Sequence, residues 1–119
     1  MTQEIDKNKR TIEQLIKVHG IENVLVDKES CILYAQDIHS KTIPAFAIIR
    51  PKNKDELTES VKIANKLDHA IIPRGGGMSY SKGYVPLKEG SIIVDFSRMN
   101  NVIEINEEDM YVRVESGCT

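Results

Sequence analysis

The chain has 119 residues, which suffices for one domain and excludes most enzymes built from two modules. Apolar residues make up 40% and charged residues 29%, a balance typical of a chain with an ordinary buried core. The formal net charge of -2, without any cluster of basic and aromatic residues, argues against nucleic acid as a partner.

The N-terminal residues predict a short amphipathic helix from about Lys9 to His19. Its inward face is formed by Ile12, Leu15, Ile16 and His19. Asn8 or Thr11 can cap its start, and Gly20 stands where a residue with positive φ would end it. The following stretch, residues 21–42, has a mixed pattern in which residues 27–30 favour a turn, so we expect an irregular lead-in.

A strand, a crossover helix and a parallel strand are predicted next. The unbroken apolar run from Ala45 to Ile49 is typical of a strand that is buried on both faces. Asn53, with Glu56 three residues later, has the pattern of a capping box and predicts a helix from about Lys54 to Asp68. The short apolar run from Ala70 to Pro73 follows directly and completes the unit.

After Pro73 a long stretch without clear periodicity, residues 74–90, is rich in glycine. Loops of this length are usually functional or disordered. Three further strands are then predicted, at Ser91–Phe96, Val102–Asn106 and Tyr111–Glu115. The sequence stops at Thr119, soon after a strand and without a closing helix, and we interpret it as a piece of a longer protein.

The most informative residues for function are three consecutive glycines: Gly75, Gly76 and Gly77. Without side chains, they let a phosphate approach the backbone, and their N–H groups can converge on an anion. They follow a strand that ends in rigid Pro73, and Arg74 and Ser79 add a cation and a hydroxyl. These neighbours favour a diphosphate-binding loop over a flexible linker or tight turn, although the glycines alone fit either.

Two commoner phosphate motifs are absent. No stretch matches GxxxxGK[ST], the phosphate-binding loop of many nucleotide hydrolases. A GxGxxG fingerprint that starts at Gly75 would require glycine where Tyr80 stands, and no helix pattern follows it. Any phosphate is therefore expected to be bound by loop amides.

The run PRGGGMSYSKGYVP, followed by SIIVDFSRMNNVIEIN and YVRVESGCT, resembles the FAD-binding domain of the FAD-linked oxidase family. This family includes D-lactate dehydrogenases, glycolate oxidase, vanillyl-alcohol oxidase and alkylglycerone-phosphate synthase. The resemblance covers about residues 45–119 and implies an α+β fold. We expect the N-terminal half of a PCMH-type FAD-binding domain, with a short N-terminal helix and a mixed sheet that starts β-α-β. Residues 1–40 would form the N-terminal helix and lead-in, and residues 41–119 the first, truncated half of the domain.

The resemblance also implies which residues bind FAD. The residues that would wrap its diphosphate are Pro73, Arg74, Gly75, Gly76, Gly77, Met78 and Ser79. Pro86 would close this loop, Gly117 would bring backbone close to the cofactor, and four residues of the DFSRMN motif would lie along it: Asp95, Ser97, Met99 and Asn100.

Structural alternatives remain open for the later residues. Asp95 and Ser97 could cap a turn, Met99 could fill the core, Asn100 could supply a turn conformation and Gly117 could end a strand. For the three consecutive glycines, the cofactor role is favoured.

Met78 stands where flavoproteins with a covalent FAD often carry histidine. A thioether has no nucleophilic nitrogen, so we expect non-covalent FAD, bound somewhat more weakly because the hydroxyl residue common in the family is missing. Tyr34 and Asp37 resemble a family stretch that precedes the first strand, and we expect them to serve packing and turn formation.

No metal site is expected. Cys31 and Cys118 lie far apart without a CxxC motif and are predicted to be free thiols, while His19, His39 and His69 lack metal-ligand spacing. The polar N-terminus and short apolar runs predict neither a signal peptide nor a membrane span. A cytoplasmic protein is expected, with peripheral membrane association left open.

The resemblance implies a flavin-dependent oxidoreductase that oxidises a small molecule, a 2-hydroxy acid such as D-lactate or glycolate. Flavin supplies the redox chemistry and is then reoxidised by another acceptor, such as an electron-acceptor protein or iron–sulfur subunit. The catalytic residues are expected beyond Thr119, in the remainder of the chain, and none is named here. Two alternatives stay open: a cofactor-binding fragment without activity of its own, and a small interaction domain whose glycine loop is a structural hinge.

Overall fold

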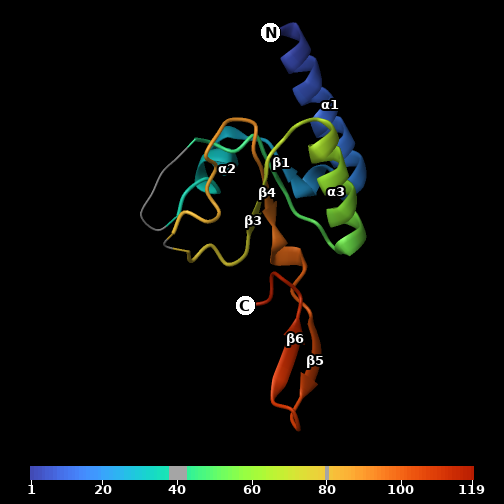
Figure 1. The fold of residues 1–119 in the computed structure, drawn as a ribbon. Coiled ribbons are helices and arrows are strands. Elements are labelled where there is room, and N and C mark those ends of the chain that lie inside the picture. The colour runs from blue at the N-terminus through green and yellow to red at the C-terminus, as the bar shows by residue number, and fades with distance from the viewer. Residues whose placement is uncertain (38–42, 80) are drawn as a thin grey trace.

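The computed structural model describes residues 1–37, 43–79 and 81–119. His39 and the predicted boundary between residues 40 and 41 lie outside these ranges, so that boundary stays a prediction. The described residues form a four-stranded mixed sheet with helices on both faces and a separate two-stranded hairpin (Figure 1). The expected α+β fold with an N-terminal helix and a mixed sheet is therefore confirmed.

The first helix is longer than predicted. Helix α1 spans Thr2–His19 and begins at Thr2 without a side-chain cap, so the predicted cap at Asn8 or Thr11 is wrong. The Thr11 hydroxyl instead donates to the Lys7 carbonyl oxygen inside the helix at 2.9 Å. Gly20 ends the helix as predicted, with a φ of 82° and an N–H that donates to the Ile16 carbonyl oxygen.

The lead-in is more regular than predicted. A short 3-10 helix at Ile21–Asn23 is followed by β1 at Val24–Leu25 and by α2 at Lys28–Leu33. The residues interpreted as a turn start α2, because the Asp27 carboxylate accepts the Ser30 N–H at 2.9 Å and caps the helix. The predicted turn at residues 27–30 is therefore wrong, because Asp27 is the cap of a helix.

The strand–helix–strand unit is confirmed, with a shorter first strand, a shorter helix and a second strand that is shifted by one residue. Strand β2 spans Ala47–Ile49, helix α3 spans Lys54–Lys66 and strand β3 spans Ile71–Arg74. The Asn53 half of the capping box is present, because Asn53 Oδ1 accepts the Glu56 N–H at 2.9 Å. The Glu56 carboxylate accepts the N–H of Lys52, one residue before the cap, at 2.8 Å.

The order of the sheet is β1-β2-β4-β3, which places β4 (Ile92–Asp95) between the two strands that α3 connects. Strands β2, β4 and β3 are parallel and β1 is antiparallel to β2. All four residues of β4 are buried, which suits a central strand. Strand β3 contains Pro73, whose missing N–H is tolerated at an edge.

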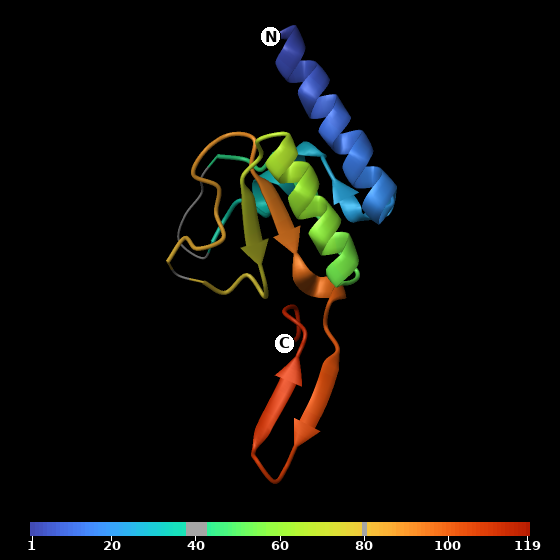
Figure 2. The same cartoon turned by 45° about the vertical axis from the view of Figure 1, so that its right-hand side comes forward.

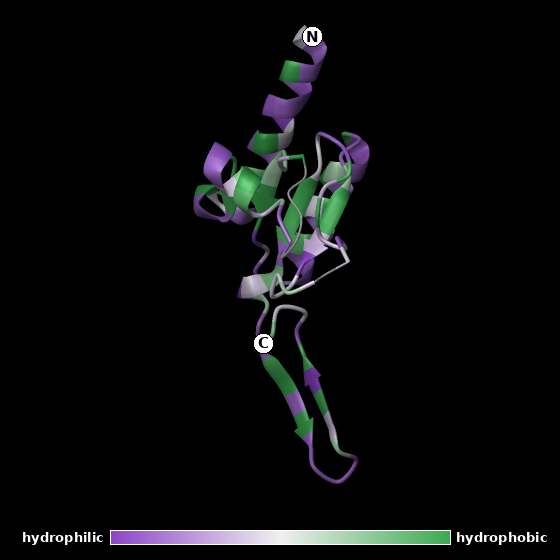
Figure 3. Cartoon of the chain, turned by 90° about the vertical axis from the view of Figure 1, so that its left-hand side faces the viewer, coloured by the Kyte–Doolittle hydropathy of each residue, from purple (hydrophilic) through white to green (hydrophobic). Residues whose placement is uncertain are grey.

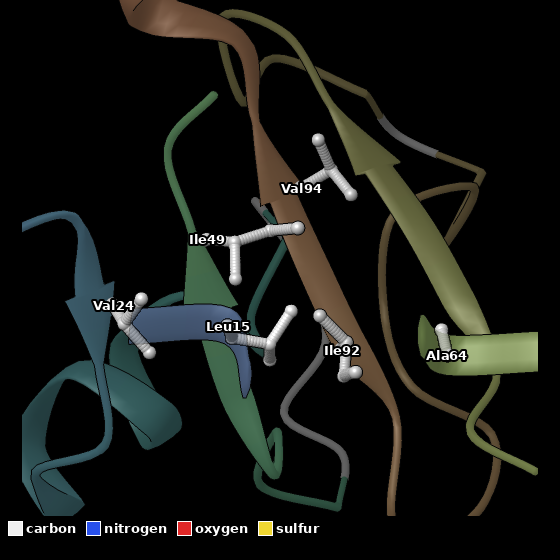
Figure 4. Close-up of a cluster of buried hydrophobic side chains, with 6 residues drawn as sticks. All are labelled: Leu15, Val24, Ile49, Ala64, Ile92 and Val94. Atoms are coloured by element: carbon white, nitrogen blue, oxygen red, sulfur yellow. The ribbon is translucent and has the colours of Figure 1, made fainter. Parts of the chain in front are cut away.

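The core lies on both faces of this sheet. Helices α1 and α3 cover one face, where the buried cluster consists of Leu15, Val24, Ile49, Ala64, Ile92 and Val94 (Figure 4). On the other face α2 contributes to a second cluster of Cys31, Ala45, Ile48 and Ile93. Neighbouring strand residues point to opposite faces, so the apolar runs are buried on both sides. Figure 3 shows hydrophobic colour along these central strands.

A hairpin follows the sheet and extends away from it (Figure 2). A 3-10 turn at Phe96–Arg98 leads into β5 (Val102–Asn106) and β6 (Tyr111–Val114), close to the predicted bounds. One face carries polar contacts, with Arg113 Nη2 3.4 Å from Glu104 Oε2. No helix in the described ranges combines the length and apolar character needed to cross a membrane.

Candidate functional site

A cavity of about 480 Å³ lies at the carboxyl ends of β3 and β4. The carboxyl ends of parallel strands are where open α/β sheets usually bind ligands. The cavity is lined by Leu33, Tyr34, Arg74, Gly75, Gly76, Asp95, Ser97, Asn100, Gly117 and Thr119. The C-terminal residues reach it because the chain returns to the sheet after the hairpin (Figure 2).

The cavity brings together residues that are far apart in the sequence. The predicted site residues that line it are Arg74, Gly75, Gly76, Asp95, Ser97, Asn100 and Gly117. The predicted residues that do not line it are Pro73, Gly77, Met78, Ser79, Pro86 and Met99. The structure thus gathers part of the predicted site, and direct contact with a cofactor stays a prediction for every one of these residues.

The backbone is open at the first two glycines. A Cβ atom added to Gly75 would meet nothing within 4 Å, and one added to Gly76 would meet only Thr119 Cγ2, at 3.8 Å. Among the described residues, no acceptor takes the N–H of either glycine. The loop therefore offers backbone donors with space in front of them, as a diphosphate would require.

At Gly77, the backbone conformation and the nearby Arg74 side chain both favour glycine. Its φ is 73°, in the region that favours glycine, and an added Cβ would lie 2.7 Å from Arg74 Nη2. Its carbonyl oxygen accepts a hydrogen bond of 2.6 Å from the Tyr84 hydroxyl. Gly77 therefore lets the loop close tightly over the Arg74 side chain.

Arg74 is held firmly beside the cavity. Its Nη1 donates to the Tyr34 carbonyl oxygen at 2.9 Å. Its guanidinium also faces two aromatic rings, with Cζ 5.0 Å from the centroid of Tyr34 and 4.8 Å from that of Tyr84. The positive charge is thereby fixed at the lining of the cavity.

Asp95 is buried, and its carboxylate has several partners. Oδ1 accepts the Ser97 N–H and Oδ2 accepts the Tyr34 hydroxyl, both at 2.9 Å, while Arg50 Nε lies 3.9 Å from Oδ2. The bond to Ser97 is the turn cap that the sequence left open as an alternative. Burial, and then the hydrogen bond to Asp95, raises the pKa of Tyr34, so its hydroxyl remains a donor at neutral pH.

The remaining predicted site residues lie outside the lining of the cavity and differ in exposure. The Met78 side chain is 69% exposed, and Ser79 Oγ lies 3.1 Å from Ser81 Oγ. Pro86 is fully buried, Met99 is 8% exposed, and Pro73 belongs to edge strand β3. For Met99 the structure supports core packing, the alternative that the sequence left open.

Gly117 allows two backbone segments to come close. A Cβ there would overlap the Phe96 carbonyl, and the Gly117 N–H donates to the Met99 carbonyl oxygen at 2.9 Å. The close approach seen here joins two backbone segments at the wall of the cavity, and the expected approach of the Gly117 backbone to the cofactor stays a prediction. The segment that Gly117 approaches is the 3-10 turn after β4.

The two described histidines have structural contacts. His19 Nε2 bonds to the buried Ser60 hydroxyl between α1 and α3. His69 Nε2 lies 2.9 Å from Thr11 Oγ1, and His69 Nδ1 lies 2.8 Å from the Gly90 carbonyl oxygen. Within residues 1–37, 43–79 and 81–119, no three His, Cys, Asp or Glu side chains gather as metal ligands.

Sequence reasoning missed the importance of Tyr34. It assigned this residue to packing, whereas the structure places it in the lining and in contact with both Arg74 and Asp95. These partners lie 40 and 61 residues away along the chain, so no local pattern signals the contacts. Leu33 and Thr119 also line the cavity without having been predicted.

Known proteins similar to this chain also indicate a FAD-binding domain. Residues 45–119 match a family model described as FAD binding domain. Glycolate oxidase subunit GlcD from Bacillus subtilis (strain 168) is 34% identical over 107 residues, 88% of this chain and 22% of that protein. Mitochondrial D-lactate dehydrogenase [cytochrome] from Kluyveromyces lactis is 32% identical over 72 residues, 59% of this chain and 12% of that protein.

The fold is also found among solved structures. The structure of p-cresol methylhydroxylase with substrate bound matches with a TM-score of 0.83 and 24% sequence identity. The match covers 96% of this chain and 23% of that one. The chain therefore spans less than a quarter of the length of each of these three proteins.

Proposed function

We propose that this chain, which belongs to the FAD-binding domain family, is the FAD-binding portion of an oxidoreductase that oxidises a small 2-hydroxy acid. The family has FAD as its cofactor and includes flavin-dependent oxidoreductases. The observation that carries the proposal is the open pair of glycine amides at Gly75 and Gly76, beside the fixed charge of Arg74.

The residues of the cavity fit a dinucleotide diphosphate. The amides of Gly75 and Gly76 would donate to its oxygen atoms, and Arg74 would offset its negative charge. Ser97 and Asn100 also line the cavity and provide further polar groups. When bound, FAD supplies the two-electron redox chemistry, and the residues of this chain bind and orient it.

The substrate class is supported by the names of the relatives. One is a glycolate oxidase subunit and another is a D-lactate dehydrogenase, and glycolate and D-lactate are both 2-hydroxy acids. Because the chain spans 22% of the glycolate oxidase subunit, we place the catalytic residues and the substrate pocket in the remainder of a longer protein. The word subunit in that name supports a partner protein, such as an electron acceptor or an iron–sulfur subunit. A cytoplasmic location remains part of the proposal.

Non-covalent binding fits the surroundings of Met78. Covalent attachment through this position would need a nucleophilic side chain, and the Met78 thioether is exposed and does not line the cavity. We therefore expect FAD to dissociate when the protein is denatured by acid and to remain in solution after the protein is precipitated.

A FAD titration of the 119-residue chain tests the proposal. Quenching of flavin fluorescence, together with shifts of the Gly75 and Gly76 amides in ¹H–¹⁵N spectra, would support a cofactor site. If FAD binds but neither D-lactate nor glycolate reduces a dye acceptor, the chain is a cofactor-binding fragment without its own turnover. If neither FAD nor inorganic pyrophosphate moves these amides, a structural hinge is the better explanation.

A further inference from the structure

Tyr34 contacts both charged residues that line the cavity. Its hydroxyl donates to Asp95 Oδ2, and its carbonyl oxygen accepts from Arg74 Nη1, each at 2.9 Å. Its ring lies against the Arg74 guanidinium as well. Tyr34 follows α2, whereas Arg74 and Asp95 end β3 and β4. One residue thus connects three segments at the mouth of the cavity.

We propose that Tyr34 is a positioning residue of the FAD site, which holds the glycine loop and both charges in the arrangement that receives the diphosphate. The inference rests on the proposed function and deepens it. Tyr34 acts through Arg74 and Asp95, and the proposal requires no direct contact between Tyr34 and FAD.

The glycine loop is held on both sides of Gly75 and Gly76. The Arg74 guanidinium packs against the rings of Tyr34 and Tyr84, and the Tyr84 hydroxyl donates to the Gly77 carbonyl oxygen. The loop is therefore anchored just before and just after Gly75 and Gly76, whose amides have no described acceptor. Donors that are already ordered bind an anion without a further loss of conformational entropy.

The two charged residues of the cavity act on a diphosphate in opposite ways. Arg74 attracts a diphosphate, whereas the Asp95 carboxylate repels it. The Asp95 side chain is 8% exposed and depends on the Tyr34 hydroxyl, the Ser97 N–H and the nearby Arg50 guanidinium. Without the tyrosine hydroxyl, this buried carboxylate would lose a donor and present more negative potential to the cavity.

Two substitutions separate the hydroxyl of Tyr34 from its ring. Tyr34→Phe removes the bond to Asp95 and keeps the ring against Arg74, while Tyr34→Leu removes both. We expect Tyr34→Phe to weaken FAD binding about tenfold, as for the loss of a hydrogen bond to a charged group, and Tyr34→Leu to weaken it further. Affinity is measured by isothermal titration calorimetry on the 119-residue chain.

Tyr111→Phe is the matched control. It also removes a bond from a tyrosine hydroxyl to a carboxylate, at 3.0 Å to Glu104, but on the hairpin and outside the cavity. Its FAD affinity should equal that of the unchanged chain, and its thermal unfolding should change less than that of Tyr34→Phe, because the Glu104 carboxylate is more exposed than that of Asp95. Equal FAD affinity in Tyr34→Phe, Tyr34→Leu and the control would overturn the proposal.

A ligand-free measurement separates this inference from the proposed function. The Nε–H resonance of Arg74 should be shifted upfield by the two rings, should keep that position in Tyr34→Phe and should move downfield in Tyr34→Leu. If the unchanged chain fails to bind FAD, the proposed function fails while this signal still reports whether Tyr34 positions Arg74. An Arg74 signal that is the same in Tyr34→Leu would contradict the positioning role, and if this variant does not fold, Tyr34→Phe carries the test.

Discussion

The Nδ1 atom of His19 lies 3.8 Å from Oε1 of Glu56 and has no hydrogen-bond partner among the described residues. On the other side of the ring, Nε2 bonds to the Ser60 hydroxyl. Because that hydroxyl donates to the Glu56 carbonyl oxygen at 2.9 Å, it accepts from Nε2–H, so in the neutral ring Nδ1 carries no proton. Burial lowers the pKa of His19 and so favours this neutral ring in the contact between α1 and α3.

Acid should weaken this helix contact. Burial lowers the pKa of His19, outweighing the opposite effect of Glu56, while Arg98 lowers it slightly more. A histidine with a lowered pKa in the folded state binds its proton more readily when unfolded, so its contribution to stability is present above about pH 6.5 and is lost as the pH falls below that value. In urea unfolding experiments, the free energy of unfolding should fall as the pH is lowered below about 6.5.

His19→Gln isolates the histidine in that experiment. Glutamine keeps an N–H donor for Ser60 and does not titrate, so the decline of stability with acid should be smaller in the variant. A pH dependence of equal slope in both chains would show that other groups cause the decline.

Alanine at Gly77 should reduce stability, whereas alanine at Gly75 should reduce ligand binding. Gly77→Ala places a Cβ against the Arg74 guanidinium at a positive φ and should destabilise the fold by about 1–2 kcal/mol. Gly75→Ala meets no neighbour and should change stability by less than about 0.5 kcal/mol, but its methyl group would hinder the approach of a diphosphate. Chemical denaturation and FAD titration of both variants check this, and equal stability of the two would refute the distinction.

The two cysteines should differ in reactivity. Cys31 is 6% exposed, and burial raises the pKa of its thiol, with a further contribution from Asp27. Cys118 is partly exposed, so iodoacetamide should modify it first in the native chain, at a rate at least about tenfold higher. Mass spectrometry of digested samples measures both rates.

Denaturation supplies the control for the cysteine experiment. In urea, where burial no longer separates them, the two thiols should react at similar rates. Comparable rates in the native chain would mean that Cys31 is not protected as its position between α2 and the sheet implies.

Features with local causes could be predicted from the sequence. The unbroken apolar run of β2, the Asn53 cap of α3 and the bounds of β5 are all present, because strand burial and helix capping depend on neighbouring residues. The predicted start of α1 and the predicted turn at Asp27 are wrong, because polar residues there fit a helix as well as a turn.

Other features were decided by the tertiary structure. Strand β4 enters between β2 and β3, because a strand buried on both faces is most stable at the centre while the strand with Pro73 tolerates the edge. The three consecutive glycines look alike in the sequence. In the fold, Arg74 packs against two tyrosines and its guanidinium occupies the space beside Gly77, whereas the space beside Gly75 and Gly76 stays open. Contacts between residues distant along the chain arise from the packing of whole elements, which short-range patterns do not encode.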